Sequence, residues 1–207
     1  MREIAYKALK HRHKATEKNL RYRTNQLRKA GIEIETLDDP APQAPTLHQL
    51  LDRHCQRKNG RPFPFGVDFL TNLKRHLGAR AQVRVARRDS RVLGVSVGLC
   101  NGDTMAMRAV GIDEHHPLSA ATYHALVYYR PIREAAEEGI CQLHLGTHAY
   151  DPKVRMGSRL VDSSLFIRAR TPAQDLLLRA VLPLRSRRIK EQVGPFRAVA
   201  ARTNPGT

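Results

Sequence analysis

The sequence predicts a mixed α/β fold, in which a central mixed, mostly antiparallel sheet is flanked by helices. Two observations lead to this prediction. A strand–turn–strand unit occupies residues 81–112, and it is followed by a helical stripe and then one more strand-like segment. The chain has 207 residues and is 41% hydrophobic, which is enough apolar material for one core.

The strands are predicted from alternating apolar residues and from one turn signal. Val83 and Val85 lie on the same face of an extended segment, since side chains alternate along a strand. Asn101-Gly102 tolerates positive φ and predicts a tight hairpin. The predicted strands are 32–37, 81–86, 91–99, 104–112, 140–146 and 163–168.

The helices are predicted from apolar spacing, caps and breakers. Pro131 interrupts one apolar stripe, and because it removes the amide that would bond to the carbonyl of Val127, we expect a kink there. Thr171-Pro172-Ala173-Gln174 is a capping box with proline at the first helical position. The predicted helices are 1–30, 46–58, 67–77, 118–138 and one that begins at 172.

Positive charge is concentrated at both ends of the chain. The 36 Lys and Arg residues against 19 Asp and Glu give a net charge of +17. Residues 1–30 contribute +8 (ten basic, two acidic) and residues 176–207 contribute +6 (seven basic, one acidic). We therefore expect a single domain over 1–207, with a basic helix over 1–30, a core over 31–170 and a basic helix and tail over 171–207. The partner is expected to be nucleic acid or an anionic membrane surface.

Several functional classes are excluded by simple features. No apolar run approaches 18 residues and no signal-peptide core follows the first charges, so we expect neither a membrane span nor secretion. Cys55, Cys100 and Cys141 have no CxxC spacing, which argues against a disulfide framework and a cysteine-based metal site. We expect a cytoplasmic protein without a bound metal.

Four segments resemble the Fem-like, peptidoglycan-biosynthesis-type transferases of the GNAT (GCN-related N-acyltransferase) superfamily. They are the basic entry NLRYRTNQLRKAGIEI, the hairpin that ends in Gly-Ile-Asp, the helix containing YYRPI, and the tail LHLG followed by AYDPK and a glycine. They lie, in order, at 19–34, 91–113, 123–139 and 143–157, so that the resemblance covers residues 15 to 170.

The resemblance implies a GNAT-like fold and transfer of an acyl or aminoacyl group to an amine, with the donor carbonyl in a gap between strands 104–112 and 141–146. Acyl-CoA enzymes of this superfamily begin the following helix with a glycine-rich loop that holds pyrophosphate. The corresponding stretch, 114–121, contains Pro117 and no glycine. Fem-like enzymes also lack this loop, and several use aminoacyl-tRNA. The expected donor is therefore aminoacyl-tRNA, as a co-substrate with no other cofactor; acyl-CoA is the alternative.

The resemblance and the residue types together suggest the site. Asp113 ends a strand beside the gap, where it either binds or deprotonates the acceptor amine or caps the loop. The histidines are alternative proton acceptors, although each is also consistent with an ordinary structural role. The expected catalytic residues are Asp113, His116, His144 and His148, and the expected substrate-binding residues are Ser119, Tyr123, Tyr150, Lys153 and Arg155.

The basic ends are expected to contact the phosphates of tRNA, since the chain has 5% aromatic residues and no tryptophan for base stacking. A solvated helix face and a non-catalytic RNA-binding module are the alternatives. The acceptor is expected to be a small-molecule or peptidic amine, and monomer and homodimer remain open. The RNA-binding residues proposed are Lys7, Lys10, Arg12, Lys14, Lys18, Arg21, Arg23, Arg28, Lys29, Arg185, Arg187, Arg188 and Lys190.

Overall fold

The computed structural model describes residues 14–146, 153, 158 and 169–203. The chain divides into two compact units, residues 1–146 and 147–207, and each is described by itself. The predicted strand 163–168 of the core falls outside the described residues, as do His148, Tyr150 and Arg155.

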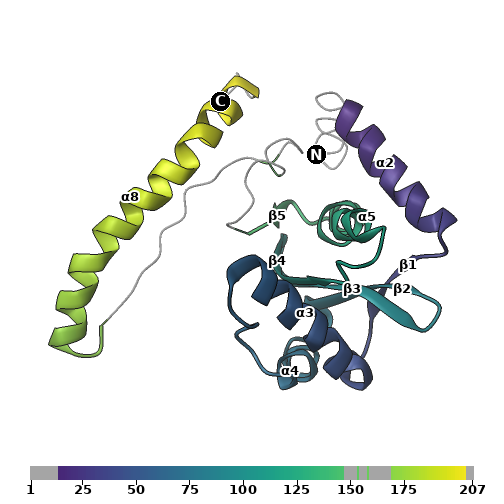
Figure 1. The fold of residues 1–207 in the computed structure, drawn as a ribbon, viewed down its shortest axis with the longest axis horizontal. Helices are drawn as coiled ribbons and strands as arrows, with labels where there is room; N and C mark the ends of the chain where they lie inside the picture. Colours follow the sequence, from purple (N-terminus) through teal and green to yellow (C-terminus); the bar gives the residue numbers. More distant parts are fainter. Residues whose placement is uncertain (1–13, 147–152, 154–157, 159–168, 204–207) are drawn as a thin grey trace. The chain divides into compact units, whose positions relative to one another are not determined.

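The first unit contains a five-stranded sheet among the described residues, with the strands in chain order, β1-β2-β3-β4-β5 (Figure 1). The first four strands pair antiparallel, and β4 pairs parallel with β5. The predicted mixed, mostly antiparallel sheet is therefore confirmed. The strands are β1 (Glu33–Leu37), β2 (Ala81–Arg88), β3 (Arg91–Asn101), β4 (Thr104–Ile112) and β5 (Gln142–His144).

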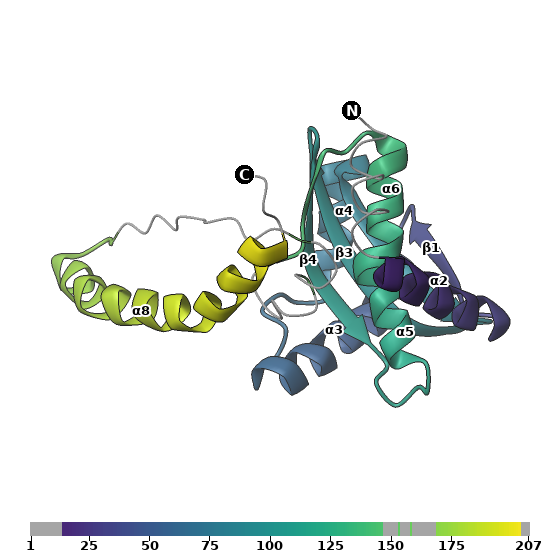
Figure 2. The same ribbon diagram turned by 90° about the horizontal axis from the view of Figure 1, so that it is seen from above.

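Helices cover both faces of this sheet. Figure 1 shows α3 and α4 on one face and α2 and α5 on the other, and Figure 2 shows α6 continuing from α5. The predicted helix at 46–58 begins two residues earlier, with proline in its first turn and no side-chain cap. The helices of this unit are α2 (Lys14–Lys29), α3 (Ala44–Asn59), α4 (Asp68–Leu77), α5 (Ser119–His124) and α6 (Arg130–Glu138).

Each face of the sheet has its own apolar core. Under α3 and α4, the fully buried Leu47, Leu51 and Leu70 pack on valines that alternate along β2 and β3. Under α2 and α5, a smaller cluster centres on Leu126, with Leu27 from α2 and Ile112 from β4. The alternating valines that predicted the strands thus point toward α3 and α4, because every second side chain of a strand lies on the same face.

The predicted hairpin between β3 and β4 is confirmed. Asn101 pairs with Thr104, so that the loop consists of Gly102 and Asp103, and Gly102 has a φ of +57°. Glycine adopts this left-handed backbone conformation without the steric penalty of a Cβ atom. The turn signal in the sequence therefore located the start of β4 correctly.

The helix after β4 approaches β3 closely because β3 carries small residues on that face. A Cβ atom on Gly94 would lie 2.8 Å from Leu126 Cδ1 and 2.9 Å from Ile112 Cδ1. Ser96, two residues along β3, is fully buried on the same face. The small side chains on β3 thereby set the distance between the helix and the sheet.

The kink expected at Pro131 takes the form of a π-helical turn, Ala125–Tyr129, between α5 and α6. The Arg130 N–H donates to the carbonyl of Ala125, five residues earlier, which leaves the Leu126 carbonyl without that donor. The next residue, Pro131, has no N–H to supply. Instead, the buried Ser96 hydroxyl donates to the Leu126 carbonyl at 3.2 Å. A side chain from β3 therefore satisfies the carbonyl that the wide turn leaves unpaired.

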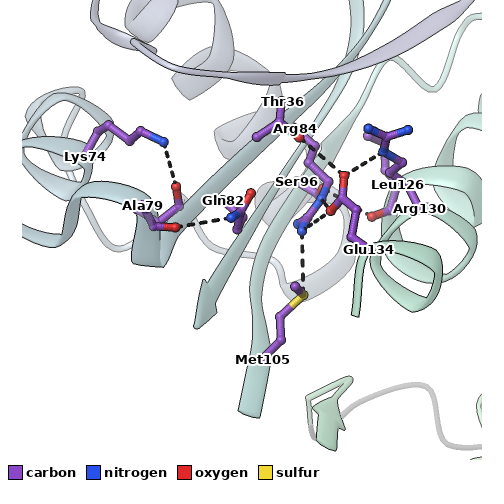
Figure 3. Close-up of polar contacts among 11 residues, drawn as sticks. Thr36, Lys74, Ala79, Gln82, Arg84, Ser96, Met105, Leu126, Arg130 and Glu134 are labelled. Atoms are coloured by element: carbon purple, nitrogen blue, oxygen red, sulfur yellow. Dashed lines mark hydrogen bonds and ion pairs between the residues drawn. The ribbon is translucent and has the colours of Figure 1, made fainter. Parts of the chain in front are cut away.

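A buried ion pair joins β2 to α6 (Figure 3). Arg84 is fully buried and donates to Glu134 Oε2. Glu134 Oε1 also accepts from Arg130 Nε at 2.6 Å and from the Thr36 hydroxyl at 3.4 Å. Arg84 Nη2 lies 3.6 Å from Met105 Sδ, whereas Nη1 has no hydrogen-bond partner among the described residues. The sequence reading gave Arg84 no role.

The described part of the second unit is dominated by α8, a 32-residue helix (Pro172–Thr203). The Gln174 N–H donates to the Thr171 hydroxyl at 3.3 Å, and the Arg170 N–H donates to Gln174 Oε1 at 3.1 Å. The predicted cap and the proline at the first helical position are both present. No helix within the described ranges is both long and apolar enough to cross a bilayer.

Candidate active site

The β4 and β5 strands part soon after they begin. They pair only at Thr104 with Gln142, Met105 with Leu143 and Ala106 with His144. Within the described residues, the edge of β4 from residue 107 to 112 is therefore unpaired on this side. Such an edge exposes backbone N–H and C=O groups to a substrate. The expected gap between the two strands therefore begins at residue 107 of β4.

A bulge in β4 lies at the start of this gap. In the pairing with β3, Val97 faces Ala109 and Gly98 faces Met107, so that Arg108 has no partner in β3. A bulge bends its strand and redirects the backbone groups next to it. Arg108 is exposed at this point and adds a positive charge to the β4 edge.

Asp113 fastens the loop after β4 to β3. Its N–H donates to the Leu93 carbonyl at 2.8 Å, and its Oδ2 accepts from Arg91 Nη2 at 2.6 Å. The other carboxylate oxygen accepts from the His115 N–H at 3.2 Å. These contacts are those of the loop cap, one of the two roles considered for Asp113, and the carboxylate lies beside the end of β4.

The amides of this loop are directed inward. The His116 N–H donates to Asp113 O at 3.2 Å, and the Ser119 N–H donates to His116 O at 2.9 Å. The Leu118 N–H donates to His116 Nδ1 at 3.2 Å, which places the proton of a neutral His116 on Nε2. Pro117 has no N–H. The four N–H groups that are present between His115 and Ser119 all donate to acceptors within the loop. Between His115 and Ser119, the loop therefore offers no free amides for a pyrophosphate.

A charged cluster that the sequence reading missed lies where β4 ends. His54 Nδ1, on α3, is 3.0 Å from Glu114 Oε1, and Arg57 contacts the other oxygen of the same carboxylate. The His54 contact is at ion-pairing distance but outside hydrogen-bond alignment. The ring also stacks beside Tyr123 of α5, with centroids 6.3 Å apart. The cluster thus joins α3, the loop and α5.

Burial keeps His54 uncharged at neutral pH. Desolvation, with smaller contributions from the Lys58 and Arg57 charges, lowers the pKa of His54 to about 4. Burial also raises the pKa of Tyr123, which contacts the buried Tyr128 with ring centroids 6.1 Å apart. A neutral imidazole beside a carboxylate is able to accept a proton. No sequence motif marks this pair, since 60 residues separate its members.

We predict that His54 makes the protein sensitive to acid. The unfolded chain binds a proton on His54 near pH 6.5, whereas the folded chain binds it near pH 4, so unfolding becomes easier as pH falls between these values. The free energy of unfolding therefore decreases between pH 7 and pH 4.5. Replacing His54 by Gln should make this decrease smaller by about 1–2 kcal/mol, after allowance for partial exposure of the ring. Chemical denaturation at pH 7 and pH 4.5 measures it. The exposed His76, replaced by Gln, is the control; equal pH dependence in all three proteins would contradict the prediction.

The other expected site residues are distributed as follows. Ser119 begins α5 and Tyr123 lies near the end of this short helix; both are half-buried, and His144 is exposed at the end of β5. Lys153 belongs to the second unit; it is buried, and desolvation lowers its pKa. His148, Tyr150 and Arg155 lie outside the described residues. The structure thus brings Asp113, His116, Ser119 and Tyr123 to one end of β4.

The basic residues expected to bind RNA lie on α2, on α8 or outside the described residues. On α2, Arg23 is half-buried and Lys18, Arg21, Arg28 and Lys29 are exposed; on α8, Arg187 is exposed. The helices also contain Lys14, Arg185, Arg188 and Lys190, and Lys7, Lys10 and Arg12 lie outside the described residues.

In the described part of the chain, no group of three or more His, Cys, Asp or Glu residues is arranged to hold a metal ion.

Comparison with known proteins identifies the family. The model of the family described as acetyltransferase (GNAT) domain matches residues 14–154. The chain therefore belongs to this family, and it is an acyltransferase of the GNAT type. The GNAT-like fold expected from the resemblance is confirmed, whereas the Fem-like subtype stays a prediction. No curated protein sequence matches the chain significantly.

Two solved structures illustrate the shared fold. A possible acetyltransferase from Clostridium difficile 630 is 13% identical, with a TM-score of 0.50, over 68% of this chain and 98% of the other. A ribosomal-protein-alanine N-acetyltransferase from Brucella melitensis biovar Abortus 2308 is 17% identical, with a TM-score of 0.51, over 67% and 99%. Both are similar to this chain in fold, and each is matched over nearly its whole length.

Proposed function

We propose that this acyltransferase takes its acyl group from aminoacyl-tRNA and passes it to an amine of a small molecule or peptide. The observation that carries the proposal is the loop after β4, whose amides from His115 to Ser119 are used internally and include a proline. A donor held through its phosphate backbone by Lys and Arg does not need a pyrophosphate cradle. We place the reaction in the cytoplasm, where charged tRNA is made.

The net charge of +17 supports a polyanionic donor. Lys18, Arg21, Arg28 and Lys29 are exposed on α2, whose described residues include only one acid, Glu17. Within α2, Lys18, Arg28 and Lys29 have no acidic residue four positions before or after them to neutralise their charge. An RNA acceptor stem, recognised by its shape and phosphates, has the complementary charge.

The transfer itself is assigned to the gap between β4 and β5. The donor carbonyl enters the gap, and an N–H of the unpaired β4 edge polarises its oxygen. The amine nitrogen attacks the carbonyl carbon, the C–N bond forms, and the ester C–O bond to the ribose breaks. A base takes a proton from the amine, and the departing ribose oxygen gains one.

The proton acceptor is proposed among residues near the end of the two strands. Asp113, His116, His144 and His148 are the residues expected from the sequence, and we add His54, which is neutral and lies beside Glu114. Ser119, Tyr123, Tyr150, Lys153 and Arg155 are proposed to hold the donor or the acceptor. Replacing His54 by Gln tests the added residue through the pH profile of the transfer rate.

Acyl-CoA is the second candidate donor, because the matching family and the two similar structures are described as acetyltransferases. In this case the basic residues would contact the phosphates of CoA, and the loop after β4 would have to open to expose its amides. Since the chain belongs to an acyltransferase family, a non-catalytic RNA-binding module is kept only as the third outcome of the assay.

One experiment separates the three candidates. The purified chain is incubated with radiolabelled aminoacyl-tRNA or with acetyl-CoA, each with a mixture of amine acceptors. Transfer from tRNA that ribonuclease abolishes supports the proposal. Transfer from acetyl-CoA alone assigns the second function, and RNA binding without transfer from either donor assigns the third.

The charges on α2 give a prediction for RNA affinity. Replacing Lys18, Arg21 and Arg28 by Glu should make the plot of log affinity against log salt concentration shallower by about 2–3 units, since each lost phosphate contact removes about 0.7–0.9. Filter binding to tRNA between 50 and 200 mM salt measures the slope.

The matched control carries the same charge change elsewhere. Arg75, Arg80 and Arg88 are exposed on α4, after α4 and at the end of β2, and their replacement by Glu should leave the slope nearly unchanged. Equal slopes for both triple variants would remove α2 from the RNA interface.

A further inference from the structure

The candidate proton acceptors at the end of β4 differ in whether a lone pair is still unused. Both carboxylate oxygens of Asp113 already accept hydrogen bonds. A neutral His116 ring has one lone pair in its plane, on Nδ1, and this lone pair accepts from the Leu118 N–H. His54 differs from both, since no hydrogen bond to its Nε2 is formed within the described residues.

The position of the proton on His54 follows from the group that faces Nδ1. This atom lies 3.0 Å from Glu114 Oε1, and both atoms are enclosed without an aligned hydrogen bond to any described residue. If Nδ1 carried a lone pair, it would face the lone pairs of the carboxylate in a site shielded from water. A proton on Nδ1 removes this repulsion and supplies the carboxylate with a donor. The free lone pair of the neutral ring is then on Nε2.

Neighbouring residues hold this arrangement in place. Arg57 contacts the other oxygen of the Glu114 carboxylate and balances its charge. The Tyr123 ring stacks beside the imidazole of His54, with the two planes 22° apart, which limits rotation of the imidazole. Lys58, one turn further along α3, is the other charged group that acts on His54. The ring orientation is therefore determined by α3, by the loop after β4 and by α5 together.

We propose that Glu114 is a positioning residue for acyl transfer, which holds the proton of His54 on Nδ1 so that Nε2 takes the proton of the attacking amine. This proposal rests on the proposed function and selects one proton acceptor from those named there. The C–N bond forms as the amine proton moves to Nε2, and this proton passes to the ribose oxygen as the ester C–O bond breaks. Because burial disfavours the imidazolium, His54 releases the proton readily.

The test exchanges the carboxylate for an amide of the same size. In Glu114→Gln, the single side-chain oxygen pairs with the charged Arg57, so the NH2 group faces His54. Nδ1 must then accept a hydrogen bond, and the proton of the ring moves to Nε2. In protein labelled with 15N-histidine, NMR at pH 7 should show the proton on Nδ1 in the parent chain and on Nε2 in the variant. His54→Gln assigns the signals by their disappearance.

The same variant should separate kcat from KM. With its proton on Nε2, the His54 ring has no lone pair there for the amine proton. We therefore expect kcat for the transfer to fall at least about 100-fold, the lower end of the range for a general base, while KM changes little. The rates are measured with the donor that the acyl-transfer assay identifies.

Two further variants are matched controls. Glu137→Gln makes the same chemical change in the exposed ion pair with Arg133 on α6, and it should alter neither the proton position on His54 nor kcat. Arg57→Gln removes the ion pair but keeps a carboxylate facing Nδ1, so the proton should stay on Nδ1. Circular dichroism and the melting temperature check that each variant is folded.

Three results would overturn the proposal. The first is a parent chain with the proton of His54 on Nε2, which is measured without changing Glu114. The second is a Glu114→Gln variant that keeps the proton on Nδ1 or retains the kcat of the parent chain. The third is the absence of transfer from either donor. Transfer from acetyl-CoA alone would instead reject only the aminoacyl-tRNA donor of the proposed function, so the two failures are distinguishable.

Discussion

Replacing Glu134 by Ala is expected to lower the free energy of unfolding by about 3–5 kcal/mol, because it leaves the charge of the fully buried Arg84 without its partner. Glu134 also accepts hydrogen bonds from Arg130 and Thr36, which lose their acceptor in the same variant. Urea denaturation monitored by circular dichroism measures the change.

The same helix provides a matched control. Glu137 pairs with Arg133 at 2.7 Å, but both side chains are more than half exposed. Exposed pairs of this kind contribute little, so Glu137→Ala should change the free energy of unfolding by less than about 0.5 kcal/mol. A similar loss in both variants would mean that the helix, rather than the buried pair, determines the effect.

A double replacement separates the missing charge from the missing side chain. Changing Arg84 to Met together with Glu134 to Leu removes both charges and keeps apolar volume at the interface. Since a buried ion pair is often replaced by hydrophobic residues at little expense, this variant should regain most of the stability that Glu134→Ala loses. A double variant as unstable as the single one would contradict this account.

Replacing Gly111 by Ala is expected to lower the free energy of unfolding by about 1–3 kcal/mol, the usual range for overpacking. The new Cβ atom would lie 2.5 Å from Leu50 C and Leu51 N and 2.7 Å from Leu50 O. These are backbone atoms, which cannot rotate away as a side chain does, so α3 as a whole has to move from β4. Denaturation with urea measures the loss.

The displacement of α3 in the Gly111→Ala variant should also be detectable at the candidate active site. His54 follows Leu51 by one turn of α3, and its carboxylate partner Glu114 follows Gly111 by three residues. Moving α3 outward therefore separates the two groups, and the pKa of His54, followed by NMR titration, should shift. Gly66→Ala is the control, since it has no atom within 4 Å and no positive φ. Equal stability of the two variants would show that α3 tolerates the extra atom.

Local patterns predicted much of the fold. The Asn101-Gly102 turn and the alternation around Val83 located β2, β3 and β4 closely, because turns and strand faces depend on neighbouring residues. Pro131 correctly indicated a break in its helix, but not that Ser96 would supply the missing donor. That donor comes from β3, 35 residues before the proline, and no local pattern connects them.

The candidate site was less predictable for the same physical reason. Asp113 and the loop without glycine were found because they follow a predicted strand directly. His54 and Arg84 were missed, since the residues that define their surroundings, Glu114 and Glu134, lie 60 and 50 residues away. The local pattern was misleading for Arg84, because a basic residue between two valines is typical of a strand with one face in water, whereas Arg84 is fully buried.

The π-helical turn determines which side of α6 meets the sheet. Its extra residue rotates everything that follows by about 100° relative to an uninterrupted α-helix. Glu134 lies after this turn, and its orientation toward Arg84 depends on that rotation. Deleting one residue from 125–129 would thus turn the carboxylate away from β2 by more than a quarter of a circle, even if the helix itself re-formed without a defect.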